Sequence, residues 1–270
     1  MEGRVYTVTG AASGIGQATA VRLAELGAAG VAISDVNEAG LKTTEELCKK
    51  YAPKAKVTIR KLDVRINEDV EKWIEDTYAE FGRLDGAANV AGVAGGEGDT
   101  TVETIVSGKG SKSVRDGANV QVQRQKDWEF IMNINLTGVM QCMRAQLAKI
   151  TKPGGSIVNV SSTSGIHGLP HSAAYAASKH GVIGLTSSAA GEFGKKGVRI
   201  NSLLPGPIDT QIFRDGEAKG LFSADTMGGD TILGRMGKAE EVAKVLVFLL
   251  SDDASYVTGG KWTVDGGYTA

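Results

Sequence analysis

Short runs of β-branched and apolar residues alternate along the chain with longer segments in which apolar residues recur every three or four positions. The first run spans residues 5–9, and after a group of glycines Ile15, Thr19, Leu23 and Leu26 follow at helical spacing. The alternation continues with strands predicted at 30–35, 56–64 and 85–92 and with helices between them that end near Tyr51 and Phe81.

The second half of the chain repeats this pattern. A stripe of mostly apolar positions predicts one long helix, made by Trp128, Ile131, Asn135, Gly138, Cys142 and Ala145, with Asn135 as a polar residue on an apolar face. Strands are predicted at 156–162, 197–205 and 261–264, and helices at 173–193 and 240–250. Repeated βα units predict an α/β fold: a doubly wound, seven-stranded parallel sheet with helices on both faces.

Two segments interrupt the alternation. Residues 93–126 are rich in glycine and scattered charge, and we expect a long insertion loop after the fourth strand. Residues 207–235 carry short helical patches between glycines, at the place where a lid over a substrate would lie. No linker or repeat separates these segments from the rest, so the sequence predicts a single domain over residues 1–270.

Composition narrows the partners. The 30 basic and 31 acidic residues nearly cancel, which argues against nucleic acid or a membrane surface and favours a small-molecule ligand. Cys48 and Cys142 lack metal-ligand spacing and are expected to be reduced thiols. The start of the chain has no targeting leader and no run of about 18 apolar residues follows, so we expect a cytoplasmic location.

A cluster of glycines lies between the first strand and the first helix. Gly10, Gly14 and Gly16 occur in "TGAASGIG", where a tight turn and a helix N-terminus can hold the pyrophosphate of a dinucleotide. The spacing differs from G-x-G-x-x-G, and a flexible turn is the alternative interpretation. The strand-turn-helix context favours a dinucleotide site.

Asp35 ends the second strand, where a carboxylate can accept hydrogen bonds from the adenosine ribose and repel a 2′-phosphate. Ser13 and Val36, near the place of that phosphate, are uncharged. These residues predict NAD(H) over NADP(H). A helix-capping role for Asp35 is the alternative.

The stretch "YAASK" separates Tyr175 from Lys179 by one helical turn, about 6 Å along a helix axis. A neighbouring ammonium is expected to lower the pKa of a phenol and make it competent for proton transfer. The spacing alone also arises by chance. Ser162, thirteen residues before Tyr175, strengthens the catalytic interpretation because it ends a strand at the carboxyl edge of the sheet.

With these motifs in order, the chain resembles the classical short-chain dehydrogenase/reductase family, which has a Rossmann fold. The resemblance covers nearly the whole chain and includes "TGAASGIG", "LDV" at 62–64, "NVAG" at 89–92, "NINLTG" at 133–138, "YAASK" and "PGPIDT" at 205–210. The chain also looks somewhat like fungal members of secondary metabolism.

The resemblance implies roles for individual residues. Tyr175 would be the catalytic acid/base, Lys179 would bind the nicotinamide ribose, Ser162 would hold the substrate oxygen and Asn135 would hold a water in a proton relay. Cofactor contacts would come from Gly10, Ser13, Gly14, Ile15, Gly16, Asp35, Asp63, Val64, Asn89, Ala91, Tyr175, Lys179, Pro205, Gly206, Ile208 and Thr210. The resemblance also implies a homotetramer or homodimer.

The sequence departs from the family in two places: Val90 replaces the second asparagine of the usual "NNAG", and the insertion at 93–126 is unusually long. The first is expected to adjust cofactor binding and the second to shape the substrate pocket. No metal site is expected, because His167, His171 and His180 lack suitable spacing and carboxylate partners.

The sequence thus predicts an NAD(H)-dependent oxidoreductase that interconverts a secondary alcohol and a ketone or aldehyde on a small or medium molecule. The rival hypothesis is a cofactor-loaded scaffold for binding or non-redox cyclisation or isomerisation. A serine hydrolase is disfavoured because "NVSSTS" lacks the G-x-S-x-G elbow.

Overall fold

The computed structural model of the chain describes residues 1–94, 120–168, 172–211, 213–214 and 224–270. Most of the expected insertion at 93–126 and part of the expected lid at 207–235 therefore lie outside the described residues. The same is true of His171.

One seven-stranded parallel sheet forms the centre of the protein, as the sequence predicts. Its spatial order is β3-β2-β1-β4-β5-β6-β9. The strands are β1 (Val5–Thr9), β2 (Gly30–Asp35), β3 (Lys56–Lys61), β4 (Gly86–Asn89), β5 (Ser156–Val160), β6 (Arg199–Pro205) and β9 (Lys261–Val264). Strands β1, β4 and β5 are buried at every position, because helices cover both faces of the sheet.

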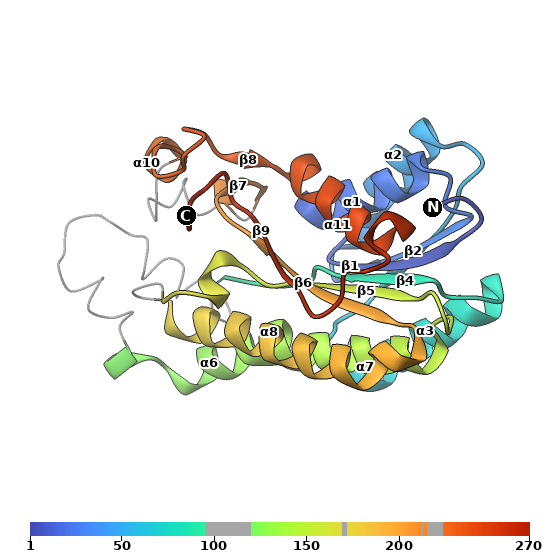
Figure 1. Ribbon diagram of the computed structural model, residues 1–270, viewed down its shortest axis with the longest axis horizontal. Coiled ribbons are helices and arrows are strands. Elements are labelled where there is room, and N and C mark those ends of the chain that lie inside the picture. Colours follow the sequence, from blue (N-terminus) through green and yellow to red (C-terminus); the bar gives the residue numbers. More distant parts are fainter. Residues whose placement is uncertain (95–119, 169–171, 212, 215–223) are drawn as a thin grey trace.

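Helices form a layer on each face (Figure 1). One layer contains α1 (Gly14–Glu25), α2 (Glu38–Tyr51) and α11 (Ala239–Leu250), whose apolar residues share one core cluster with the sheet. The other contains α3 (Asn67–Phe81), α7 (Val139–Lys149) and α8 (Ala173–Phe193), which bury a second cluster, and α6 (Gln125–Met132), which packs against α8. This arrangement is the Rossmann-like α/β fold.

The strand order reverses between β1 and β4, which are neighbours in the sheet. In open α/β sheets, ligands bind outside the carboxyl ends of the strands at such a switch point. Thr9 and Asn89 are the last residues of these two strands and are paired in register. A ligand site is therefore expected at this edge of the sheet.

The predicted long helix through Asn135 is interrupted. A π-helical segment, Asn133–Gly138, separates α6 from α7, although the predicted stripe is still directed inward. Apolar residues at every third or fourth position indicate which side of a helix faces the core. This spacing does not distinguish an α-helical turn from a wider π-helical turn. Single π-turns occur often at functional sites.

Two short elements were not predicted. Strands β7 (Ile208–Asp209) and β8 (Gly237–Lys238) pair as a separate two-stranded parallel sheet, and α10 (Ala224–Gly229) lies between them in sequence. Two residues are too few for an alternating pattern to be visible. This pair fixes the two ends of the expected lid region to each other.

Candidate active site

The glycine-rich turn after β1 requires glycine at two positions. Gly10 has φ +67°, and a Cβ there would lie 2.7 Å from the backbone nitrogen of Ala91. A Cβ on Gly16 would lie 2.1 Å from the carbonyl oxygen of Gly10. Any side chain would thus push the turn away from β4 or from the start of α1.

The N-terminus of α1 is open to an anion. Ser13 is the N-cap residue and is exposed, its side chain accepts no capping hydrogen bond, and the first turn holds no acidic residue. The free N–H groups of such a turn bind phosphate oxygens. Thr210 lies across from this turn, because a Cβ on Gly14 would be 3.4 Å from its Cγ2 atom. These residues fit a dinucleotide pyrophosphate.

Asp35 lies beside the same turn. Its Oδ2 atom accepts from the Ala12 N–H at 3.1 Å, and its Oδ1 atom accepts from the Asn37 N–H at 2.9 Å. The N-cap of α2 is Asn37, whose side chain accepts from the Gly40 N–H, so capping is not the role of Asp35. The carboxylate keeps acceptor capacity for ribose hydroxyls.

The carboxyl ends of β1 and β4 are joined by Thr9. Its hydroxyl accepts from the N–H groups of Val90 and Ala91 at 3.0 and 3.2 Å. Thr9, Ala91 and Val64 line one small recess together with Asn89, Ile134, Gly138, Val139 and Cys142. Val64 and Ala91 are thus brought together at this edge of the sheet.

Two expected cofactor residues have other partners for their side chains. The Asn89 amide is buried and bonds to Gln146 and Asn159, at 2.8 to 3.0 Å, so only its backbone remains for a ligand. The carboxylate of Asp63 forms an ion pair with Arg65 at 2.6 Å. The partners of Asn89 were not visible in the sequence, because Gln146 and Asn159 lie far from it along the chain.

The second group of expected cofactor residues follows β6. Pro205 ends this strand, and the Gly206 N–H donates to the carbonyl of Val264 at 3.1 Å. A Cβ on Gly206 would lie 2.5 Å from the Cβ atom of Asp265, so the chain turns tightly there. Ile208 is then buried in β7, and Thr210 begins the next helical turn.

Tyr175 and Lys179 lie one turn apart on α8 and meet as predicted. The Lys179 Nζ atom is 5.6 Å from the centroid of the Tyr175 ring and donates to the carbonyl of Val160 at 3.1 Å. Lys179 is 4% exposed. Val160 ends β5, so the hydrogen bond fixes the ammonium at the carboxyl edge of the sheet.

Ser162 lies next to this pair. It caps a short 3-10 turn, Thr163–Gly165, by accepting from the Ser164 N–H at 3.1 Å, and it is only 8% exposed. The neighbouring Ser161 donates to the carbonyl of Lys179 at 2.8 Å and so ties β5 to α8. The serine, phenol and ammonium therefore converge at one edge, as the sequence predicts.

Asn135 joins the same group through the π-helical segment. Its amide makes two hydrogen bonds to the backbone of Val93, at 2.8 and 2.9 Å, and donates to Ser178 at 3.1 Å. A Cβ on Gly92 would lie 3.2 Å from Asn135 Oδ1 and 3.3 Å from Lys179 Nζ. Gly92, which the sequence analysis did not single out, thus keeps the gap between the amide and the amine open.

Burial controls the pKa values of the site. It raises the pKa of Tyr175, and the hydrogen bond with the Ser162 hydroxyl opposes this shift without cancelling it. Burial lowers the pKa of Lys179 to about 8. The net pKa of Tyr175 is therefore raised and not lowered as expected, because burial outweighs the contacts that favour the phenolate. The ammonium lies over the ring and bonds to Val160, while loss of solvent destabilises the phenolate.

This arrangement favours proton donation. Tyr175 keeps its proton at neutral pH and can give it to a developing alkoxide. Lys179, whose pKa is about 8, can gain or lose a proton close to physiological pH. Among the described residues, no cluster of three or more His, Cys, Asp or Glu side chains could hold a metal ion. In the same part of the chain, no helix is long and apolar enough to span a membrane.

Comparison with known proteins identifies the family. A family model described as enoyl-(acyl carrier protein) reductase matches residues 10–269. The short-chain dehydrogenase/reductase ABA4 of Pyricularia oryzae is 39% identical over 269 residues, which are 99% of this chain and 93% of the relative. The chain belongs to the short-chain dehydrogenase/reductase family. It is accordingly an oxidoreductase that acts on small organic molecules. The ABA4 relative comes from a fungus.

Other family members are similar over their whole length. Cyclohexanol dehydrogenase of an Acinetobacter species is 37% identical, with 99% of this chain and 95% of the relative covered. The crystal structure of levodione reductase has a TM-score of 0.85 and 33% identity, and covers 99% of this chain and 98% of the other. Related structures carry NADP in ElxO, at 30% identity and a TM-score of 0.81, and NAD in a Mycobacterium paratuberculosis dehydrogenase, at 28% and 0.83. A nicotinamide cofactor of either kind is thus typical of the relatives.

Proposed function

We propose that the protein is an NAD(H)-dependent dehydrogenase/reductase that interconverts a secondary alcohol and a ketone. The observation that carries this proposal is the convergence of Ser162, Tyr175 and Lys179 at the carboxyl edge of the sheet, beside the open N-terminus of α1. The nicotinamide ring, when bound, supplies or accepts the hydride. The protein residues orient the substrate and transfer the proton.

The proton passes through Tyr175. In the reductive direction the protonated phenol donates to the carbonyl oxygen of the substrate while Ser162 donates a second hydrogen bond to the same oxygen. Lys179 is fixed by the Val160 carbonyl one turn below the phenol, where its charge stabilises the phenolate that remains. Asn135 and the gap beside Gly92 provide the route through which a water molecule returns a proton to Tyr175.

The remaining predicted contacts form the cofactor side of the proposal. Gly10, Gly14, Ile15 and Gly16 present the start of α1 to the pyrophosphate, and Ser13 and Thr210 flank it. Val64, Ala91 and the backbone of Asn89 border the adenosine half, and Pro205, Gly206 and Ile208 border the nicotinamide half.

Asp35 supports NAD(H) as the cofactor. Its carboxylate lies beside the glycine-rich turn, and Val36, the next residue, is 60% exposed and uncharged. A 2′-phosphate at this place would meet a negative charge and no cation from these residues.

Asp35 gives the first prediction. Asp35→Asn keeps an oxygen for the Ala12 N–H while removing the charge, so the ratio of NAD to NADP affinity should fall about tenfold or more, with NAD affinity itself little changed. Asp35→Ala removes both functions and should weaken both cofactors. Dissociation constants measured by titration calorimetry test this. An unchanged NAD to NADP ratio in Asp35→Asn would place the discrimination elsewhere.

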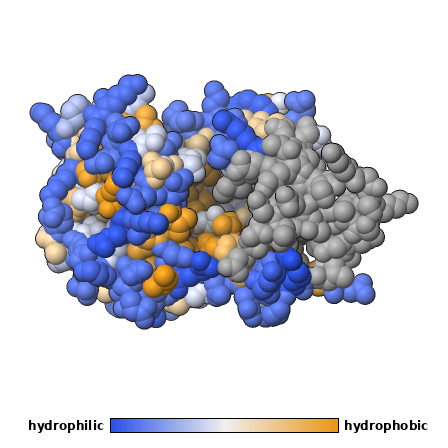
Figure 2. All heavy atoms as spheres, turned by 180° about the vertical axis from the view of Figure 1, so that it is seen from behind, coloured by the Kyte–Doolittle hydropathy of each residue, from blue (hydrophilic) through white to orange (hydrophobic). Residues whose placement is uncertain are grey.

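We further propose a cyclic secondary alcohol as substrate. One relative of comparable length acts on cyclohexanol. In this chain His167 follows β5 and Tyr268 follows β9, at the carboxyl side of the sheet, and their ring centroids are 6.0 Å apart. Figure 2 shows apolar side chains gathered near the middle of one face of the molecule.

A substrate panel tests the reaction. Cyclohexanol, substituted cyclohexanols and open-chain secondary alcohols of equal carbon number are incubated with NAD, and NADH absorbance is followed. Cyclic alcohols are expected to give the higher kcat/KM. Turnover of a substrate without any change in the redox state of the cofactor would favour a non-redox scaffold instead.

We also propose that the chain assembles into a homotetramer or homodimer in the cytoplasm. Gly184 and Gly191 of α8 face open space within one chain, and Cys48 and Cys142 are buried free thiols that suit a reducing compartment. Light scattering coupled to gel filtration measures the assembly directly, and a monomeric mass at micromolar concentration would reject it.

A further inference from the structure

One peptide unit in the glycine-rich turn is held at both ends. The N–H of Ala12 donates to Asp35 Oδ2 at 3.1 Å. The carbonyl of Ala11, which belongs to the same planar peptide unit, accepts from the Thr44 hydroxyl at 2.7 Å. In a trans peptide the N–H and C=O point in opposite directions, so these two hydrogen bonds fix the rotation of the plane between them.

Thr44 reaches the turn from α2, which follows the second strand. Its side chain is fully buried, and its hydroxyl also lies 3.1 Å from the carbonyl of Gly40 in its own helix. The Thr44 hydroxyl oxygen also accepts from the Gln17 side chain of α1 at 2.9 Å. One hydroxyl therefore connects α2, the turn and α1, with no solvent to replace it.

A close approach of α2 makes this contact possible. A Cβ on Gly40 would lie 2.7 Å from both the Cβ atom and the carbonyl oxygen of Ala12. Gly40 thus lets the first turn of α2 touch the backbone of the glycine-rich turn. The other face of the turn, where the N-terminus of α1 is open, is left free for a ligand.

We propose that Thr44 is a positioning residue for the dinucleotide. This inference rests on the proposed function, because it assigns Thr44 a role in the cofactor site that the function requires. By holding the Ala11 carbonyl, Thr44 sets the direction of the peptide plane that leads into α1 and so orients the N–H groups that meet the pyrophosphate. It acts through the turn and does not contact the cofactor.

The test compares three variants. Thr44→Val keeps the shape but removes the hydroxyl, and Thr44→Ser restores it. The matched control is Thr77→Val, because Thr77 is also a buried helical threonine but donates only within its own helix, to the carbonyl of Trp73 at 2.8 Å. The dissociation constant for NADH, without substrate, is measured by titration calorimetry, and the free energy of unfolding by urea.

Thr44→Val is expected to raise the dissociation constant roughly three- to tenfold, the size of one buried hydrogen bond. Thr44→Ser and Thr77→Val should stay within about twofold of the unaltered protein. In the absence of cofactor, amide exchange at Ala12 should be faster in Thr44→Val than in Thr77→Val.

Three results would overturn the inference. Equal NADH affinity in Thr44→Val and the unaltered protein, or an equal loss in Thr44→Val and Thr77→Val, would make Thr44 a purely structural residue. Failure of Thr44→Ser to restore affinity would have the same meaning. If the unaltered protein bound no dinucleotide at all, the proposed function would fail, and this inference with it. The affinity of the unaltered protein therefore separates the two failures.

Discussion

The proposed chemistry depends on Tyr175 and Lys179. Their spacing was visible in the sequence, but their pKa values were not. The spacing of four positions from Tyr175 to Lys179 predicts one helical face, and the structure places the Lys179 amine over the Tyr175 ring. The direction of the Tyr175 pKa was predicted wrongly, because spacing gives a distance but not the loss of solvent around a phenol. The recruitment of Asn135, Gly92 and Thr44 was visible only in part, since their partners lie far away in sequence.

Lys179 gives a prediction about stability and pH. Its pKa is about 8 in the folded protein against an ordinary value of 10.5, so the unfolded chain binds the extra proton between these values. The unfolding free energy therefore rises with pH through this window. Relative to Lys179→Met, which has no charge, the unaltered protein should gain up to about 3 kcal/mol from pH 8 to 10.5. Urea unfolding at several pH values measures the difference, and a flat difference would contradict the buried ammonium.

At the scale of elements, the sequence predicted the strands and most helices because buried parallel strands and amphipathic helices have distinct periods. It missed the π-helical segment and the β7-β8 pair. The segment Asn133–Gly138 is set by contacts with distant residues, namely the Asn135 bonds to Val93 and the approach of Gly138 to Val64. Such non-local contacts leave no periodic signal.

Gly138 tests this account of the π-helical segment. A Cβ there would lie 2.7 Å from Val64 Cγ2 and 3.3 Å from the carbonyl of Asn133, so Gly138→Ala should destabilise the fold by about 1–3 kcal/mol. Gly194→Ala, at the end of α8 with φ −56°, meets nothing within 4 Å and should be neutral or stabilising by about 0.5–1 kcal/mol. Thermal unfolding of both variants decides the matter. Equal effects would show that helical propensity, and not the Val64 contact, explains Gly138.

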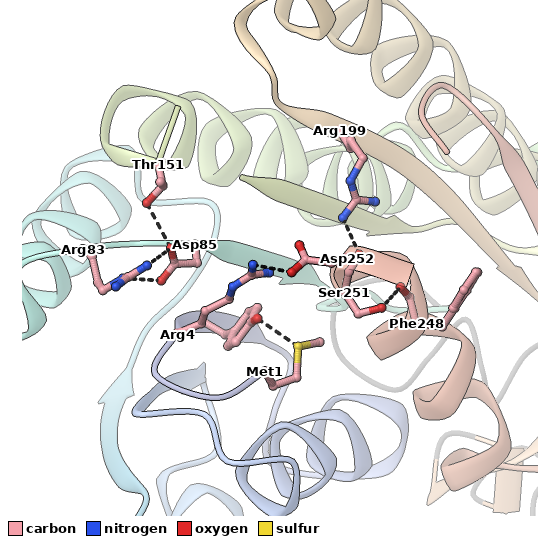
Figure 3. A network of polar contacts seen from close by, with 10 residues as sticks. Met1, Arg4, Arg83, Asp85, Thr151, Arg199, Phe248, Ser251 and Asp252 are labelled. Atoms are coloured by element: carbon pink, nitrogen blue, oxygen red, sulfur yellow. Dashed lines mark hydrogen bonds and ion pairs between the residues drawn. The ribbon is translucent and has the colours of Figure 1, made fainter. Parts of the chain in front are cut away.

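At the scale of the whole molecule, residues proposed for chemistry and residues important for stability lie at opposite ends of the strands. The proposed catalytic group of Ser162, Tyr175 and Lys179 lies at the carboxyl edge of the sheet, whereas a polar cluster gathers at the opposite edge (Figure 3). There Asp85 accepts from the Val5 N–H, from Arg83 and from Thr151. Arg199 donates to the carbonyls of Leu249 and Ser251 at the end of α11. The cluster joins three strands and two helical ends that are far apart in sequence, which sequence patterns do not reveal.

Asp85 is expected to act on stability alone. Burial raises the pKa of its carboxyl group, but the bonds from Arg83, Val5 and Thr151 outweigh this and keep it below 3.8. Asp85→Ala should therefore lower the unfolding free energy by about 2–3 kcal/mol above pH 4, and the difference should shrink as pH falls through the folded pKa. Asp252→Ala removes an exposed partner of Arg4 and should cost less than about 1 kcal/mol. NADH affinity should be normal in both, and weakened binding in Asp85→Ala would contradict the separation.

The most direct test of the proton-transfer role is Tyr175→Phe, with NADH affinity and NAD-dependent oxidation of a cyclic secondary alcohol measured on the same preparation. The phenyl ring keeps the contact with Lys179 but has no proton to exchange. Turnover should fall by about two to four orders of magnitude while the NADH dissociation constant changes less than about twofold. Near-normal turnover in this variant would contradict the central claim.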